Sequence, residues 1–187
     1  MGWATIVVIA LIVIVIIVVF ATYNGLVRAR NLCDEAWSTI DVQLKRRHDL
    51  IPNLVETVKG YAAHETEAFE NVTKARAAAM GARTTQEAAK TEGLLTQALG
   101  RLFAIAEAYP QLRAVESFTQ LQAELTSTED QIAAARRTYN ANVQMYTTKR
   151  QQFPGVLLAG PFGFSPRAFF ELDEPADREP VKVDFSS

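Results

Sequence analysis

The stretch WSTIDVQLKRRHDLIPNLVETV, residues 37–58, carries an apolar side chain at every seventh position. Seven residues complete almost two turns of an α-helix, so these side chains lie on one face. A neighbouring row is apolar too, except where Arg47 interrupts it. Such a double row is what a helix buries against partner helices. The first row is Trp37, Leu44, Ile51 and Val58, and the second is Cys33, Ile40 and Leu54.

Residues 85–108 have the same helical spacing, with signals for where the helix begins. Gly81 is a terminator for the preceding helix. Thr84 or Thr85 then supplies an N-cap, with Glu87 shortly after it.

Residues 112–152 form the most regular stretch, in which one heptad position is apolar throughout. Such a narrow apolar seam favours antiparallel packing in a helical bundle. The sequence has no strand alternation and no hairpin signal, so the fold class is all-α. The seam consists of Phe118, Leu125, Ile132, Tyr139 and Tyr146.

The number of helices depends on the region of residues 26–79. As one helix it would reach about 80 Å, much longer than its partners. A break near Pro52 or Gly60 would give helices of matching length. We therefore expect a four-helix up-and-down bundle, and a three-helix bundle with one very long helix is the alternative.

The segment KRRHDLIP, residues 45–52, is interpreted as a helix joint. Proline removes a hydrogen bond from a helix interior, and Asp49 can cap a new helix with Pro52 in its first turn. This predicts a kink or a boundary at Asp49–Pro52. The cations at residues 45–47 either bind a phosphate or lipid headgroup or lie on a solvated face. The solvated face is favoured, because successive helical residues point in different directions.

Residues Ala4 to Ala21 contain no charged side chain. At about 1.5 Å per residue they extend about 27 Å, close to the thickness of a bilayer core. We interpret them as an uncleaved transmembrane anchor; the alternative is a signal peptide, but the basic n-region is missing. Arg28 and Arg30 follow the span and no cation precedes it, apart from the terminal amine. The positive-inside rule therefore predicts a single-pass protein of the inner membrane, with its N-terminus outside and its bulk in the cytoplasm.

The C-terminal segment is rich in proline and phenylalanine. Residues 153–164, FPGVLLAGPFGF, are uncharged but too short to span a bilayer. Such an apolar strip needs a cover, which is its own bundle, a neighbouring copy or the membrane surface. Residues 171–187 form an acidic tail, unless VKVDF (181–185) docks as an edge strand. As a hypothesis, the oligomer contacts are Phe153, Leu157, Phe162, Phe164, Phe169 and Phe170.

No pattern of catalysis, cofactor binding or metal binding is present in the sequence. HETEA, from His64, lacks the second histidine of a zinc-protease motif, because Ala68 stands in its place. The single cysteine, Cys33, lies in an apolar row, so core packing is favoured over acylation. The net charge of −2 gives no indication of nucleic-acid binding.

Several long motifs resemble those of the LemA family. They are RNLCDEAWSTIDVQLKRRHDLIPNLVETVKGYAAHE (30–65), FENVTKARAAA (69–79), RTYNANVQMYTTKRQQFPGVLLAGPFGF (137–164) and VKVDF (181–185). The resemblance implies a bacterial membrane protein with an N-terminal span, an outside N-terminus and a cytoplasmic helical bundle. It implies no agreed activity and no catalytic residues. Relatives are associated with envelope stress, membrane-protease neighbourhoods and magnetosome membranes.

We therefore expect an anchor and linker at residues 1–25, a cytoplasmic bundle at 26–152, and a docking segment with an acidic tail at 153–187. The favoured function is a non-enzymatic scaffold that self-associates and organises or remodels the membrane. The alternative is an adaptor for a membrane protease or an envelope-stress enzyme. The expected partners are the lipid bilayer, further copies of the chain and, in the alternative, the protease.

Overall fold

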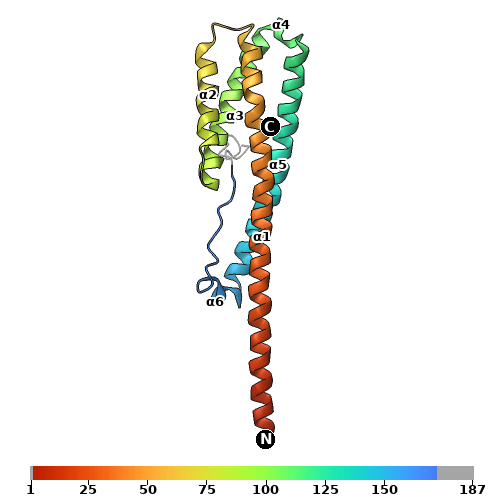
Figure 1. The fold of residues 1–187 in the computed structure, drawn as a ribbon, viewed down its shortest axis with the longest axis vertical. Helices are drawn as coiled ribbons and strands as arrows, with labels where there is room; N and C mark the ends of the chain where they lie inside the picture. Colours follow the sequence, from red (N-terminus) through yellow and green to blue (C-terminus); the bar gives the residue numbers. More distant parts are fainter. Residues whose placement is uncertain (1, 172–187) are drawn as a thin grey trace, which may run out of the picture. The chain divides into compact units, whose positions relative to one another are not determined.

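The computed structural model describes residues 2–171, and within them the chain is helical with no strand. This confirms the all-α fold class (Figure 1). The acidic tail from residue 172, including VKVDF, lies outside the described residues. The helices are α1 (Trp3–Lys59), α2 (Thr66–Met80), α3 (Thr85–Ala108), α4 (Pro110–Arg113), α5 (Glu116–Gln151) and α6 (Gly155–Ala159).

The chain forms two compact units. Unit 1 consists of the chain up to Gln43 and of Gln131–Phe169, and unit 2 of Leu44–Asp130 and the chain from Phe170. Residues 26–152, expected as one bundle, contribute to both units.

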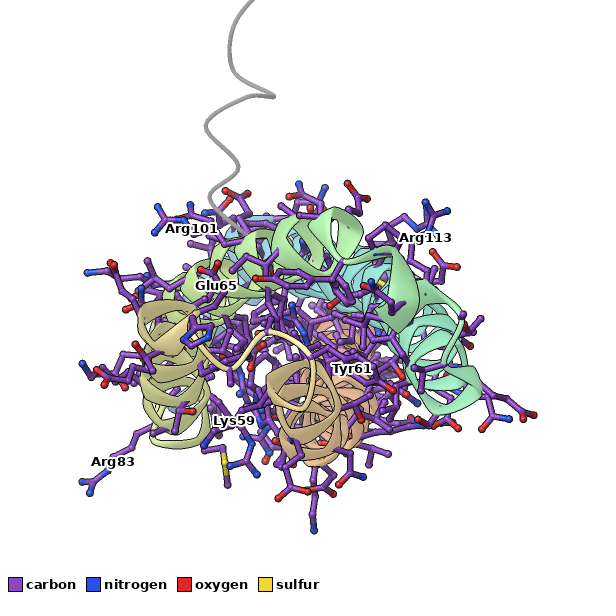
Figure 2. The ribbon with its side chains drawn as sticks, turned by 90° about the horizontal axis from the view of Figure 1, so that it is seen from above. Lys59, Tyr61, Glu65, Arg83, Arg101 and Arg113 are labelled. Atoms are coloured by element: carbon purple, nitrogen blue, oxygen red, sulfur yellow. The ribbon has the colours of Figure 1, made fainter. Side chains whose placement is uncertain are left out.

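Unit 2 is a four-helix, up-and-down arrangement of the end of α1, α2, α3 and the beginning of α5 (Figure 1). The favoured four-helix prediction is confirmed, although α1 is also very long. Figure 2 looks onto the end where Lys59, Tyr61 and Glu65 mark the turn from α1 to α2. The buried core contains Ile51, Leu54, Val58, Ala62, Phe69, Val72, Ala79, Leu95, Leu99, Leu102, Ala106, Leu112, Phe118 and Leu125.

The helix ends in unit 2 follow the predicted signals. Gly81 follows the last residue of α2, and its N–H donates to the carbonyl of Ala77 at 3.1 Å. Thr84 is the N-cap of α3, and its hydroxyl oxygen accepts a hydrogen bond from the N–H of Glu87 at 3.1 Å. The stretch expected from residue 112 differs, because a single turn, α4, precedes α5.

The helix boundary expected at Asp49–Pro52 is wrong, because α1 continues through Pro52 and ends at Lys59, before Gly60. Pro52 has no N–H to donate to the carbonyl of His48. The Nε of Arg76, on α2, donates to that carbonyl instead, at 2.7 Å. The lost hydrogen bond is thus replaced from a neighbouring helix. A bend in α1 at this point remains a prediction.

Unit 1 packs the earlier part of α1 against the later part of α5. Asn142 donates from its side-chain amide to the carbonyl of Leu32 at 3.0 Å, and the rings of Trp37 and Tyr139 lie 5.4 Å apart. The heptad seam of α5 continues into this unit, where Ile132, Tyr139 and Tyr146 are all buried. The buried residues of α1 here are Leu26, Ala29, Cys33, Ala36 and Ile40.

The first part of α1 is exposed along most of its length. Its apolar side chains from Trp3 to Phe20 are exposed, apart from one half-buried valine, Val19. Of the helices in the described part of the chain, α1 alone is long and apolar enough to cross a membrane.

We predict that the hydrogen bond from Arg76 stabilises the protein because Pro52 cannot donate to the His48 carbonyl. Arg76→Met should lower the free energy of unfolding by about 1–3 kcal/mol, because it leaves the His48 carbonyl without a donor. In a Pro52→Ala background the same change should cost less, because the N–H at position 52 then donates to that carbonyl. Urea unfolding of the four proteins gives the coupling. Lys74→Met, at an exposed position of the same helix, is the control. Equal costs in both backgrounds would contradict the compensation.

Candidate functional site

The C-terminal segment of unit 1 folds back along its own helices. Residues 164–169, here called the strap, are non-helical and follow Gly163, whose φ of +70° favours glycine. Tyr146 donates its hydroxyl to the carbonyl of Ser165 at 2.8 Å, and Tyr139 donates to that of Ala168 at 2.9 Å. The strap thus lies against α5 through its backbone carbonyls.

Charged side chains fix the same strap. Arg150 donates from Nε to the carbonyl of Phe164 at 2.9 Å, and Arg30 lies 5.5 Å from the centre of the Phe164 ring. An ion pair of 2.6 Å joins Arg167 of the strap to Asp34 of α1. Of the three covers considered for this segment, its own bundle is the one observed for the strap.

Two buried groups in this unit have raised pKa values. Burial raises the pKa of the Tyr146 phenol, although Arg150 opposes the shift. Burial likewise raises the pKa of the Cys33 thiol, against the effect of Arg167. A buried, protonated thiol is a poor nucleophile, which agrees with the predicted core role of Cys33.

The six residues expected at oligomer contacts divide into two groups. The structure buries Phe164 and Phe170 within the chain, so neither is available to a neighbouring copy. The expectation is corrected for these two, because the protein itself covers both rings. The other four are exposed: Phe153 by 79%, Leu157 by 62%, Phe162 by 54% and Phe169 by 37%.

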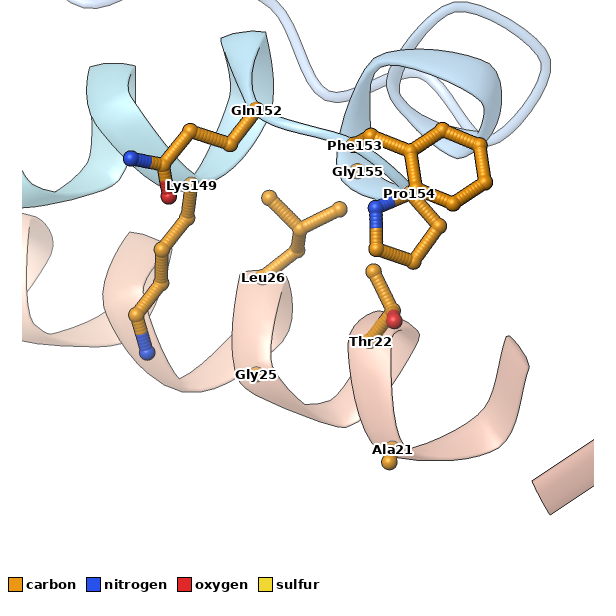
Figure 3. Close-up of a pocket in the computed structure, with 9 residues that line it drawn as sticks. All are labelled: Ala21, Thr22, Gly25, Leu26, Lys149, Gln152, Phe153, Pro154 and Gly155. Carbon is orange, nitrogen blue, oxygen red and sulfur yellow. The ribbon is translucent and has the colours of Figure 1, made fainter. Parts of the chain in front are cut away.

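One of these exposed residues, Phe153, lines a groove of about 310 Å³ (Figure 3). One wall belongs to α1 and the other to the turn from α5 to α6. Gly155 is required in this turn, because a Cβ there would collide with the carbonyl oxygen of Lys149. The lining residues are Ala21, Thr22, Gly25, Leu26, Lys149, Gln152, Phe153, Pro154 and Gly155.

Unit 2 contains a buried charge cluster around Arg47, the residue that interrupts the apolar row of α1. Arg47 and Glu92, on α3, are each only 1% exposed. The guanidinium lies 2.8 Å from Glu92 Oε2 and donates to the hydroxyl of Thr96 at 2.7 Å. Its Nε lies 2.8 Å from Glu129 Oε1 on α5, an ion pair without hydrogen-bond geometry. The cluster therefore joins three helices.

His48 completes the cluster. Its Nε2 lies 2.7 Å from the second oxygen of Glu92, so both oxygens of that carboxylate have a partner. Since a carboxylate only accepts hydrogen bonds, we assign the hydrogen of the imidazole to Nε2.

Glu129 is the half-exposed member of the cluster. Burial raises its pKa; Arg47 opposes this shift, while Glu92 and Asp130 add to it. Through these contacts the cluster links α1, α3 and α5.

The structure corrects the interpretation of the three cations. Lys45 and Arg46 are exposed, as expected of a solvated face, but Arg47 is buried. Glu92 is the signal that sequence reasoning missed. It precedes Leu95, Leu99 and Leu102 at helical spacing, and so stands on the buried face of α3. An acid in one core row and a base in another indicate a buried pair.

No group of three His, Cys, Asp or Glu side chains in residues 2–171 is arranged to hold a metal ion. His64, from the incomplete zinc-protease motif, is exposed in the turn after α1.

Comparisons with known proteins give a consistent result. A family model described as the LemA family matches residues 36–185. The chain is 26% identical to magnetosome protein MamQ of Magnetospirillum gryphiswaldense, over 97% of this chain and 78% of the relative. It is 26% identical to magnetosome protein MamQ 2 of Paramagnetospirillum magneticum, over 85% of this chain and 68% of the relative. Protein LemA of Metamycoplasma hominis is also 26% identical, over 87% and 74%. These relatives and the apolar part of α1 support a membrane-associated helical protein.

We predict that the buried pair is strongly coupled. Glu92→Leu should cost about 3–5 kcal/mol of unfolding free energy, because it leaves the Arg47 guanidinium buried without its carboxylate. Combining it with Arg47→Met should cost far less than the sum of the two single changes, because the buried guanidinium is removed and the carboxylate left behind, that of Glu129, is half-exposed. Urea unfolding of the unmodified protein, the two single variants and the double variant measures the coupling free energy. Glu70→Gln, in an exposed pair with Lys74, should change stability by less than about 1 kcal/mol. Additive costs for the buried pair would contradict its coupling.

Proposed function

We propose, from the premise that the chain belongs to the LemA family, that it is a non-enzymatic, membrane-anchored helical scaffold. In this proposal the chain self-associates and organises or remodels the membrane. The observation that carries it is the continuity of α1. The uncharged run Ala4–Ala21 and the residues that pack into the units belong to one helix. No flexible linker follows the anchor, so the orientation of the anchor is transmitted along the helix.

Self-association has two supports. The first is that a membrane anchor confines the chain to a plane, so that weak contacts repeated by each copy become sufficient. The second is that apolar side chains remain exposed after the chain has folded, including Phe169 in the strap. Two of the relatives are named as magnetosome proteins, which favours a role in membranes.

A second function, an adaptor for a membrane protease or an envelope-stress enzyme, has one observation in its favour. Unit 2 has a cavity of about 140 Å³ between α3, α4 and α5. Phe103 and Phe118 line it together with Glu107 and Arg113. The lining is mostly polar, so a polar or charged side chain of a partner helix or peptide fits this cavity.

We propose a single-pass topology in the inner membrane, with the N-terminus outside and both units in the cytoplasm. The support is the excess of arginine after the span, beginning with Arg28.

The topology predicts which cysteines an impermeant maleimide can reach. In a Cys33→Ala background, a cysteine at the exposed Val42 should stay unlabelled in spheroplasts and react after lysis. The matched control, Gly2→Cys, should react before lysis. Labelling of position 42 in sealed spheroplasts would overturn the topology.

The scaffold proposal predicts a homo-oligomer. The full chain in mild detergent, at micromolar concentration, should have a protein mass of several copies by light scattering. Phe169→Ser should lower that mass while helical content stays unchanged, and Tyr61→Ser, which replaces an exposed aromatic residue of the other unit, should leave it unaltered. A monomeric full-length chain would rule out the scaffold, and the adaptor function would then replace it.

A further inference from the structure

The segment Phe153–Phe162, here called the foot, lies beside the end of the uncharged run of α1. Phe153 and Pro154 of the foot line the groove together with Ala21 and Thr22 of α1, and Thr22 points toward Pro154 (Figure 3). At the other end of the foot, the rings of Phe162 and Tyr23 lie 5.3 Å apart, edge to face. All these residues belong to unit 1. The foot is thus held at the level where the apolar surface of α1 ends.

The foot exposes large apolar side chains and no charge. Phe153, Val156, Leu157 and Phe162 are each more than half exposed. The sequence from residue 153 to residue 164 contains no charged residue. Several large apolar side chains exposed within one short uncharged segment indicate a contact with an apolar partner.

The backbone of the foot is suited to lipid. The N–H of Val156 donates to the carbonyl of Gln152 at 2.9 Å, and that of Leu157 donates to Pro154 at 3.1 Å. Phe162 and Phe164 likewise donate to carbonyls within the segment, at 3.1 and 2.9 Å. Internal pairing of these donors is what a segment needs where water is scarce.

Cations lie just beyond the foot. Lys149 lines the groove, and Arg28 follows Ala21 on α1 by seven residues. Seven residues correspond to about 10 Å along a helix, which is just beyond the depth of a headgroup layer. Cations at that level are attracted by anionic lipid headgroups.

We propose that the foot inserts into the membrane interface beside the span, with Phe153, Val156 and Leu157 at the boundary between headgroups and acyl chains. Continuity with the span selects the bilayer as the partner, because an anchored chain brings the foot to the membrane surface whether or not another copy is near. The foot then sets the depth and tilt of α1 and enlarges the cross-section of the protein in one leaflet. Of the exposed residues expected at contacts between copies, Phe169 lies outside the foot and stays available for such a contact. This inference rests on the proposed anchoring of α1, and it is independent of self-association.

The test places a nitroxide label on the foot. Leu157→Cys, in the full chain with Cys33→Ala, is reconstituted in nanodiscs that hold one copy, with phosphatidylglycerol among the lipids. Accessibility to oxygen and to a water-soluble nickel chelate is measured by spin resonance. Val42→Cys is the matched control, because Val42 and Leu157 are each 62% exposed. Ile12→Cys reports on the span, and Phe153→Cys is a second reporter on the foot should the label at 157 disturb folding.

We expect the label at 157 to favour oxygen over nickel at least severalfold more than the label at 42, and to approach the label at 12. A label at 157 as open to nickel as the label at 42 would overturn the inference. A label at 157 that is shielded from nickel only when a disc holds two copies would also overturn the inference, and would assign the foot to a contact with a neighbouring copy. Nickel access at position 12 would instead reject the anchoring, and with it the proposed function.

Discussion

A single uninterrupted helix, α1, has to meet two different surroundings. Along Ala4–Ala21 its side chains are exposed, apart from the half-buried Val19, and from Leu26 onward its apolar rows are buried in the protein. An α-helix can do both because its backbone groups are paired within the segment, whatever surrounds them. The rest of the structure depends on this continuity. In unit 1 the later part of α5 and the strap pack on α1, and in unit 2 the end of α1 belongs to one bundle with α2, α3 and the beginning of α5.

Continuity requires compensation at two positions. Pro52 deprives the His48 carbonyl of its donor inside the helix, and Arg76 supplies one from α2. Arg47 brings a charge into the core, where desolvation is unfavourable unless the charge is paired. Glu92 and Glu129 supply carboxylates at 2.8 Å, and Thr96 accepts a further hydrogen bond. A shift of one helix by a turn would separate these groups, so we infer that the cluster selects one register among helices whose apolar seams alone would tolerate several.

The phenylalanines near the C-terminus have similar sequence surroundings, but some are buried and others are exposed. Phe164 is buried because tyrosine hydroxyls and Arg150 hold the carbonyls of the strap against α5. Phe153 and Phe162 stay exposed because α6 turns back beside the end of the span. Two glycines make this path possible: Gly155 passes close to Lys149, and Gly163 adopts a positive φ. The ring of Phe164 therefore packs inside the protein, whereas the rings of Phe153 and Phe162 remain available to another partner.

The sequence by itself determined the elements and their faces. The uncharged run predicted the exposed helix, the heptad positions predicted the buried seam from Phe118 to Tyr146, and Gly81 and Thr84 predicted helix ends. These features depend on neighbours within a few turns, which a local pattern records. Tertiary structure alone decided the rest. Arg47 is buried and pairs with Glu92, 45 residues away in the sequence. The His48 carbonyl, which Pro52 leaves without a donor inside α1, accepts a hydrogen bond from Arg76 of α2. Phe164 is buried, whereas Phe153 is exposed. In each case the deciding contact joins residues far apart in the chain, so spacing along one helix carries no record of it.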